Sequence, residues 1–135
     1  MYIVILLLVY ILYLFYLTNN GNVKLAKLSH LLNIIINKSK IQKYSYTLSE
    51  SNVSSFVLNK KDIYVVLQRN GIMYDDNTII GVLLHEYSHI VCSDLENNGH
   101  TDLFNKIESV LITSANDLGV YDSTLGVDDT YPCVK

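Results

Sequence analysis

The chain has 135 residues, half of them hydrophobic, and a formal net charge of −3. This length allows one folded domain with a modest core. The lysines are scattered and give no basic field, so the sequence holds no direct evidence for nucleic-acid binding. Two cysteines, Cys92 and Cys133, exclude a disulfide-dense scaffold and a cysteine-rich zinc finger, and leave open whether they pair.

The first 17 residues, MYIVILLLVYILYLFYL, contain no charged side chain. As a helix they would extend over roughly 26 Å, close to the thickness of the hydrocarbon core of a bilayer. A signal peptide would have a basic start and a small-residue cleavage site, and a buried core helix would not be apolar without interruption. We therefore expect a single-pass transmembrane anchor at residues 1–17, a polar linker at 18–22 and a folded domain at 23–135. Lys24 and Lys27 follow the span and favour a cytosolic domain.

The folded domain is predicted to begin with a packing helix over residues 23–38. Leu25, Leu28, Leu32 and Ile35 recur at helical spacing and mark its apolar face. His30 in the same segment has no ligand-spaced partner, so we interpret it as a surface or partly buried residue.

Short β-rich runs follow at residues 43–48, 53–58 and 62–68, which predict a small antiparallel sheet. The break at residues 59–61 suits a hairpin turn, and Asn70-Gly71 supplies another turn. A helix capped by Asp76 or Asn77 is then expected to run to about Cys92.

After a loop at residues 94–99, Thr101 is expected to cap a second helix that ends near Gly119. The tail to Lys135 looks irregular. The fold class is therefore α+β: an anchor helix, a packing helix, a short antiparallel sheet and two further helices.

The segment His85-Glu86-Tyr87-Ser88-His89 is an H-E-x-x-H motif. On a helix, residues four apart point to one side, so two imidazoles can bind one metal ion. Glu86 can then accept a proton from the attacking water, while Zn²⁺ lowers the pKa of that water and polarises a carbonyl. Hydrolytic zinc needs a third protein ligand, for which His100 is the best candidate.

There are two alternatives to a catalytic site. In the first, these residues face the core or cap the helix and bind no metal, but two histidines and a glutamate on an apolar helix would then be costly unsatisfied polar groups. In the second, the zinc only stabilises the fold, but such a site would not need Glu86 at the catalytic position.

The run from His85 to Tyr121 resembles the WLM family of zinc metallopeptidases, particularly those encoded by large DNA viruses. The similarity lies in the H-E-x-x-H helix, in Gly99-His100-Thr101 followed by an aromatic residue, and in the helix that ends at Gly119-Val120-Tyr121. The resemblance implies a compact gluzincin-like (zincin-like) domain that binds zinc through His85, His89 and His100, with Glu86 as catalytic base. The membrane would then be a host or virion membrane.

The sequence therefore predicts a membrane-anchored zinc metallopeptidase that acts on a protein or peptide substrate. A tyrosine hydroxyl could help to hold the oxyanion, with Tyr87, Tyr121 and Tyr131 as candidates. One alternative is a catalytically inactive, membrane-anchored interaction or envelope protein that keeps the fold. Another is a hydrolase of a non-peptide bond, because the zinc mechanism does not specify an amide.

Overall fold

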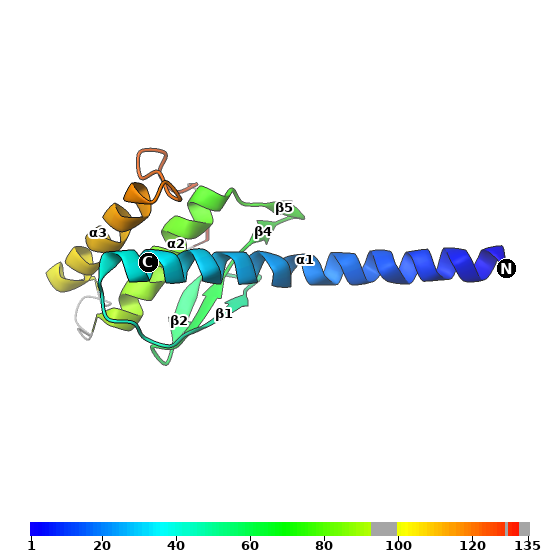
Figure 1. The fold of residues 1–135 in the computed structure, drawn as a ribbon, viewed down its shortest axis with the longest axis horizontal. Coiled ribbons are helices and arrows are strands. Elements are labelled where there is room, and N and C mark those ends of the chain that lie inside the picture. Colours follow the sequence, from blue (N-terminus) through cyan, green and yellow to red (C-terminus); the bar gives the residue numbers. More distant parts are fainter. Residues whose placement is uncertain (93–99, 129, 133–135) are drawn as a thin grey trace.

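The computed structural model describes residues 1–92, 100–128 and 130–132, with residues 17–20 described by their backbone alone. Its three helices are α1 (Tyr2–Ser39), α2 (Asp76–Val91) and α3 (Asp102–Asp117). The carboxyl-terminal half of α1 packs against the rest of the molecule, and its amino-terminal half projects away from it (Figure 1). The expected α+β class, with a long apolar amino-terminal helix, is confirmed.

Helix α1 passes through residues 18–22 without a break, where the sequence suggested a linker. Asparagine and glycine are poor helix formers, each costing up to about 1 kcal/mol relative to alanine, but only proline would block the helix outright. This segment has no proline, and the helical turns that follow it are packed in the core. The expected packing helix is thus the second half of α1, while the division into anchor and domain stays a prediction.

The three-stranded sheet has the order β1-β3-β2, with strands β1 (Thr47–Glu50), β2 (Phe56–Leu58) and β3 (Asp62–Val65). Strand β2 pairs antiparallel with β3 through the expected hairpin, but β1 pairs parallel with β3. The prediction of a purely antiparallel sheet was therefore wrong. The connection from β1 to β2 carries the chain to the opposite edge of β3, so that β3 becomes the central strand.

The predicted strand at residues 62–68 is divided, because β3 ends at Val65 and a separate two-stranded hairpin begins at Gln68. This hairpin pairs β4 (Gln68–Arg69) with β5 (Ile72–Met73). The turn between them has positive φ at Asn70 (53°) and Gly71 (80°), as a tight hairpin turn requires. The turn predicted at Asn70-Gly71 is confirmed.

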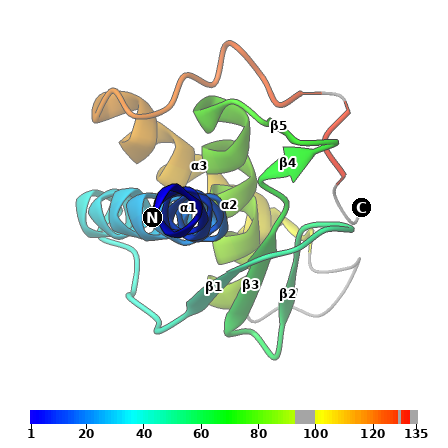
Figure 2. The same cartoon turned by 90° about the vertical axis from the view of Figure 1, so that its right-hand side faces the viewer.

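Helix α2 is the centre of the domain. It contacts the sheet through β2 and β3 on one side and the helices α1 and α3 on the other (Figure 2). Its residues Ile79, Leu83, Leu84 and Tyr87 are fully buried. From α1, Leu28, Leu32 and Ile35 enter the same core and Leu25 packs at its edge, as the helical spacing predicted.

The helix ends follow the capping rules, with one shift from the prediction. Asp75, rather than Asp76 or Asn77, caps α2 by accepting a hydrogen bond from the Thr78 backbone amide at 2.9 Å. Asp76 instead forms ion pairs with Lys24 and Lys27 of α1. Thr101 caps α3 as predicted, and Gly119 follows its end with φ 72°.

Candidate metal centre

Three histidine side chains meet where α2 faces the start of α3. His85 and His89 lie one turn apart on α2, and His100 comes two residues before α3 begins. One ligand nitrogen from each lies within 4.8 Å of those of the other two. The structure therefore brings together all three residues that were predicted as ligands from the sequence.

The spacing of these nitrogens fits a single small cation. The Nε2 atoms of His89 and His100 are 3.2 Å apart. Two nitrogens bound to one zinc at 2.0–2.1 Å in tetrahedral geometry would be about 3.3 Å apart. Neutral imidazole nitrogens are also ligands that zinc prefers. The donor set therefore suits zinc in both chemistry and geometry.

Phe104 forms an apolar support beneath the three imidazoles. Its ring centroid lies 5.1 Å from that of His85, 4.5 Å from that of His89 and 4.9 Å from that of His100. The side chain is 1% exposed, so it closes the site from the protein side. Close packing of this kind restricts the rotamers of the histidines and preorganises the ligand set.

Glu108 is a functional candidate that the sequence interpretation missed. Its Oε2 lies 2.6 Å from Nδ1 of His85. A ligating histidine commonly donates its second ring N–H to a carboxylate, which fixes the ring and leaves Nε2 for the metal. His100, Phe104 and Glu108 follow one another at intervals of four residues. This four-residue spacing between a candidate ligand and an acidic residue was the sequence signal that could have identified Glu108.

The electrostatic environment favours a proton acceptor at Glu86 and a neutral imidazole at His89. Burial raises the pKa of Glu86 to about 7, a shift that His85 opposes and Glu108 reinforces. Burial, with the neighbouring His85 and His100, lowers the pKa of His89 to about 4. For His85, burial lowers the pKa but the Glu108 carboxylate outweighs it, so the net shift is upward. At neutral pH, His89 is thus ready to bind a cation, and the pKa of Glu86 lies near the pH at which a general base works best.

Two of the three candidate tyrosines have structural roles. The Tyr87 hydroxyl accepts from the Tyr44 backbone amide at 3.1 Å and donates to the Gln42 carbonyl at 3.2 Å. The Tyr131 hydroxyl donates to the Val66 carbonyl at 2.6 Å. Both hydroxyls are therefore engaged with the backbone inside the core, which suits them to a structural role.

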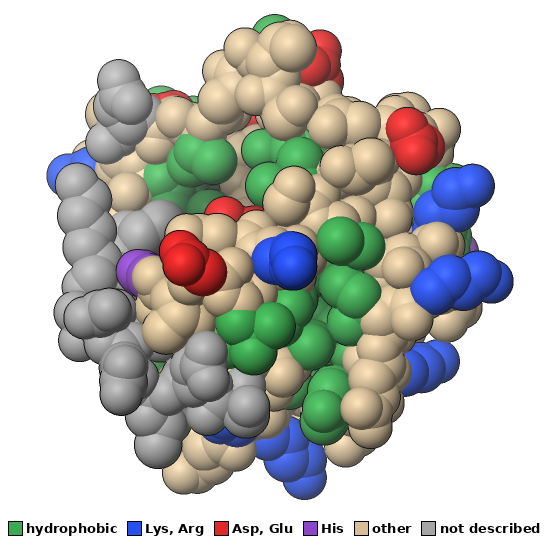
Figure 3. All heavy atoms as spheres, turned by 90° about the vertical axis from the view of Figure 1, so that its left-hand side faces the viewer, with side chains coloured by type: hydrophobic (Ala, Val, Ile, Leu, Met, Phe, Trp, Pro, Cys, Tyr) green, Lys and Arg blue, Asp and Glu red, His purple; other side chains and the backbone are tan. Residues whose placement is uncertain are grey.

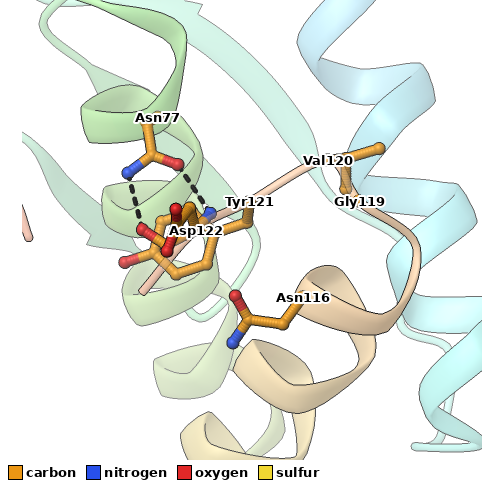
Figure 4. Close-up of a pocket in the computed structure, with 6 residues that line it drawn as sticks. All are labelled: Asn77, Asn116, Gly119, Val120, Tyr121 and Asp122. Carbon is orange, nitrogen blue, oxygen red and sulfur yellow. Dashed lines mark hydrogen bonds between the residues drawn. The ribbon is translucent and has the colours of Figure 1, made fainter. Parts of the chain in front are cut away.

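Tyr121 lies beside α2, between it and the end of α3 (Figure 4). It packs on Gly81, one helical turn before His85, and a methyl group built there would lie 3.0 Å from the tyrosine oxygen. Burial raises its pKa, and the charges of Glu108 and Asp122 add to that shift. The backbone of Asp122 exchanges hydrogen bonds with the Asn77 side chain and holds this segment against α2. Tyr121 is also buried in the core, and it is the one candidate oxyanion residue of the three that packs against α2 one turn from His85.

The remaining predicted residues are peripheral. His30 is exposed on α1, as expected. Cys92 is buried at the end of α2. Cys133 and the predicted loop at residues 94–99 lie outside the described residues.

Comparisons with known proteins find relatives among large DNA viruses. Uncharacterized protein 136R of Invertebrate iridescent virus 6 is 39% identical over 74 residues, which are 52% of this chain and 40% of the relative. Uncharacterized protein 042R of Invertebrate iridescent virus 3 is 41% identical over 70 residues, covering 50% and 42%. Uncharacterized protein R325 of Acanthamoeba polyphaga mimivirus is 35% identical over 75 residues, covering 53% and 36%.

The chain thus spans about two fifths of the length of these relatives. No protein-family model matches it, and no solved structure does either.

Proposed function

We propose that this chain is a zinc-dependent peptidase of the WLM type, anchored in a membrane by the first half of α1. The observation that carries the proposal is the convergence of His85, His89 and His100 within 4.8 Å, with Glu86 beside them in the H-E-x-x-H order. The relatives that the chain matches are viral proteins whose names assign no activity.

His85, His89 and His100 would hold the ion, which when bound supplies a Lewis acid that acidifies a water molecule and polarises the scissile carbonyl. Glu86 would take the proton of the attacking water and pass it to the leaving amine. Its buried position suits this role, because a carboxylate with a pKa of about 7 can both accept and return a proton near neutral pH. Glu108 would keep the imidazole of His85 in the tautomer and orientation that binding requires.

The hydroxyl of Tyr121 would donate a hydrogen bond to the developing oxyanion. The raised pKa of this residue keeps its hydroxyl protonated, as a donor must be. Its place beside Gly81 puts it one turn from His85 along α2.

Membrane anchoring is supported by the length and composition of α1. The helix is long and apolar enough to cross a bilayer, and the apolar window of its sequence is not buried by the rest of the protein. From Tyr2 to Leu14, every side chain is hydrophobic and at least 42% exposed. Such a continuous apolar surface is costly in water and favourable in lipid. The site would then act on protein or peptide substrates close to a membrane surface.

The decisive test compares Glu86→Gln with the wild type, both as the full chain in detergent and loaded with zinc. Cleavage of a mixed peptide library, followed by mass spectrometry, should occur with the wild type and vanish in Glu86→Gln, while zinc content stays equal. Glu50→Gln, a glutamate on β1 that does not contact the histidines, is the matched control and should cleave normally. Wild-type protein that holds zinc but cleaves no peptide would contradict the peptidase proposal and favour the interaction protein.

A further inference from the structure

The β4–β5 hairpin lies at the level along α1 where the apolar part of the helix ends (Figure 1). A methyl group at Gly21 of α1 would lie 3.0 Å from Oε2 of Glu50, the last residue of β1. The other oxygen of that carboxylate, Oε1, lies 3.5 Å from the amide nitrogen of Gln68, with which β4 begins. Through the Glu50 side chain, these contacts place the start of the hairpin near the level of Gly21, and Figure 1 shows the hairpin pointing in the direction of the amino-terminal half of α1.

Gly21 lies a short distance along α1 from the apolar segment. Gly21 lies four residues beyond residue 17, or about 6 Å along the helix axis. The headgroup layer on each side of a bilayer is about 5–7 Å thick. The apolar segment of 17 residues is also slightly shorter than the hydrocarbon core, and a short span draws its flanking residues toward the bilayer. A bilayer around the first half of α1 would therefore bring its headgroups to the hairpin.

The surface at this level exposes apolar side chains. Ile72 is 75% exposed and Met73 44% exposed on β5, and Val53, in the connection between β1 and β2, is 79% exposed. Val53 and the hairpin residues from Gln68 to Gly71 line one hollow of about 690 Å³, so the two segments are neighbours. Ile72 and Met73 are exposed apolar residues of a strand that, within the described part of the chain, pairs with β4 alone.

The view from the opposite end of the molecule shows lysine or arginine side chains along one side, together with acidic and hydrophobic side chains (Figure 3). Exposed apolar side chains therefore occur at that end too. What sets Val53, Ile72 and Met73 apart is their position near the level of Gly21, where the apolar half of α1 ends.

We propose that Val53, Ile72 and Met73 form a second membrane contact, which enters the interfacial layer of the same bilayer that α1 spans. This inference rests on the proposed membrane anchoring. The contact, together with α1, would hold the domain at two points and so fix its rotation about the helix axis. The histidine cluster, on the far side of the core from β4 and β5, would then keep a constant orientation to the membrane surface.

The sequence contains no tryptophan, so a single introduced tryptophan is an unambiguous fluorescent reporter. We would prepare Ile72→Trp and Val53→Trp as full chains in phosphatidylcholine vesicles with and without brominated acyl chains. Leu8→Trp reports on the span itself. Leu58→Trp is the matched control, because Leu58 is an exposed aliphatic residue (47%) whose pairing with Asp62 puts it at the other end of the sheet. Far-UV circular dichroism would establish that each variant is folded.

The expected result is a blue-shifted emission and loss of fluorescence to brominated lipid at positions 8, 72 and 53, with neither effect at position 58. Quenching at position 8 without quenching at 72 and 53 would overturn the second contact while the anchor stands. Absence of quenching at position 8 would overturn the anchor and the contact together. None of these outcomes depends on peptidase activity, so the test separates this inference from the catalytic proposal.

Discussion

Nδ1 of His85 and Oε2 of Glu108 lie 2.6 Å apart and join the motif helix to α3 at the candidate metal site. The contact links a ligand predicted from the sequence to an acid that the motif does not contain. Glu108 is partly buried, so water competes only in part for the histidine N–H.

Replacing Glu108 with glutamine should weaken zinc binding about 10- to 100-fold, the usual effect of losing the carboxylate partner of a ligating histidine. The amide would no longer offer a negative charge to the imidazole, and its NH₂ group could disturb the tautomer. Competition with a chromophoric chelator would measure the affinity. Lys106→Gln, an exposed change on the same helix, should leave the affinity unchanged. Equal zinc affinity for Glu108→Gln and the wild type would show that the contact has no role in metal binding.

Gly81 should not tolerate alanine, although alanine usually favours a helix by about 1 kcal/mol. The added methyl group would lie 3.0 Å from the Tyr121 oxygen and 3.2 Å from a methyl group of Val127. Overpacking typically costs about 1–3 kcal/mol, which outweighs the gain in helix propensity. Urea denaturation of Gly81→Ala should therefore show reduced stability. The added change Tyr121→Phe should restore part of it by removing the nearest atom, and a Gly81→Ala protein more stable than the wild type would refute the close contact.

Tyr131→Phe should destabilise the protein by about 1–3 kcal/mol, the cost of leaving the buried Val66 carbonyl without the Tyr131 donor. The Tyr131 hydroxyl donates to the Val66 carbonyl and accepts from the Val66 amide, at 2.6 and 3.0 Å. It also lies 2.7 Å from the Ser55 hydroxyl. Thermal unfolding would measure the loss. At temperatures where the variant is folded, we expect unchanged zinc content, and a loss of zinc without a loss of stability would place Tyr131 at the site instead.

Asp75 gives the protein a pH-dependent contribution to stability at the start of α2. Hydrogen bonds from the Thr78 backbone amide and hydroxyl lower its pKa below 3.8. Because the folded-state pKa is the lower one, this stabilisation is complete well above pH 3.8, begins to decrease as the pH approaches 3.8 and is lost as the pH falls through the folded-state pKa. Removing the cap with Asp75→Ala should cost about 1 kcal/mol at pH 7.

Asp75→Asn keeps a capping oxygen but cannot titrate, so it is the matched control. The stability of the wild type relative to Asp75→Asn, from urea denaturation, should decrease between pH 5 and pH 2.5. A difference that is independent of pH would mean that the Asp75 charge does not stabilise the helix.

Much of this structure could be predicted because strong local signals are present. The spacing of Leu28, Leu32 and Ile35 located the packed half of α1, and the hydroxyl of Thr101 located the start of α3. The i, i+4 spacing of His85 and His89 was sufficient to place both on one side of α2, and the capping position of Thr101 brings His100 to the same place.

Other features depended on tertiary contacts that a local pattern does not contain. Pairing of β1 with β3 is a long-range choice, so the parallel register of Thr47 with Asp62 could not be read from alternation alone. Asp76 looks like a helix cap in sequence, but Lys24 and Lys27 engage its carboxylate and Asp75 takes the capping position. Glu108 was missed because its role appears only when α3 packs against α2.

The most direct test of the central claim is the zinc content of the purified full chain in detergent, measured by elemental analysis. His85→Ala and His100→Ala remove proposed ligands, and His30→Ala is the control because His30 is an exposed histidine on α1. The account predicts one zinc per chain in the wild type and in His30→Ala, and loss or severe weakening of binding in the two ligand variants. Folded wild-type protein that binds no zinc, or a His100→Ala variant that binds it as well as the wild type, would contradict the three-histidine metal centre.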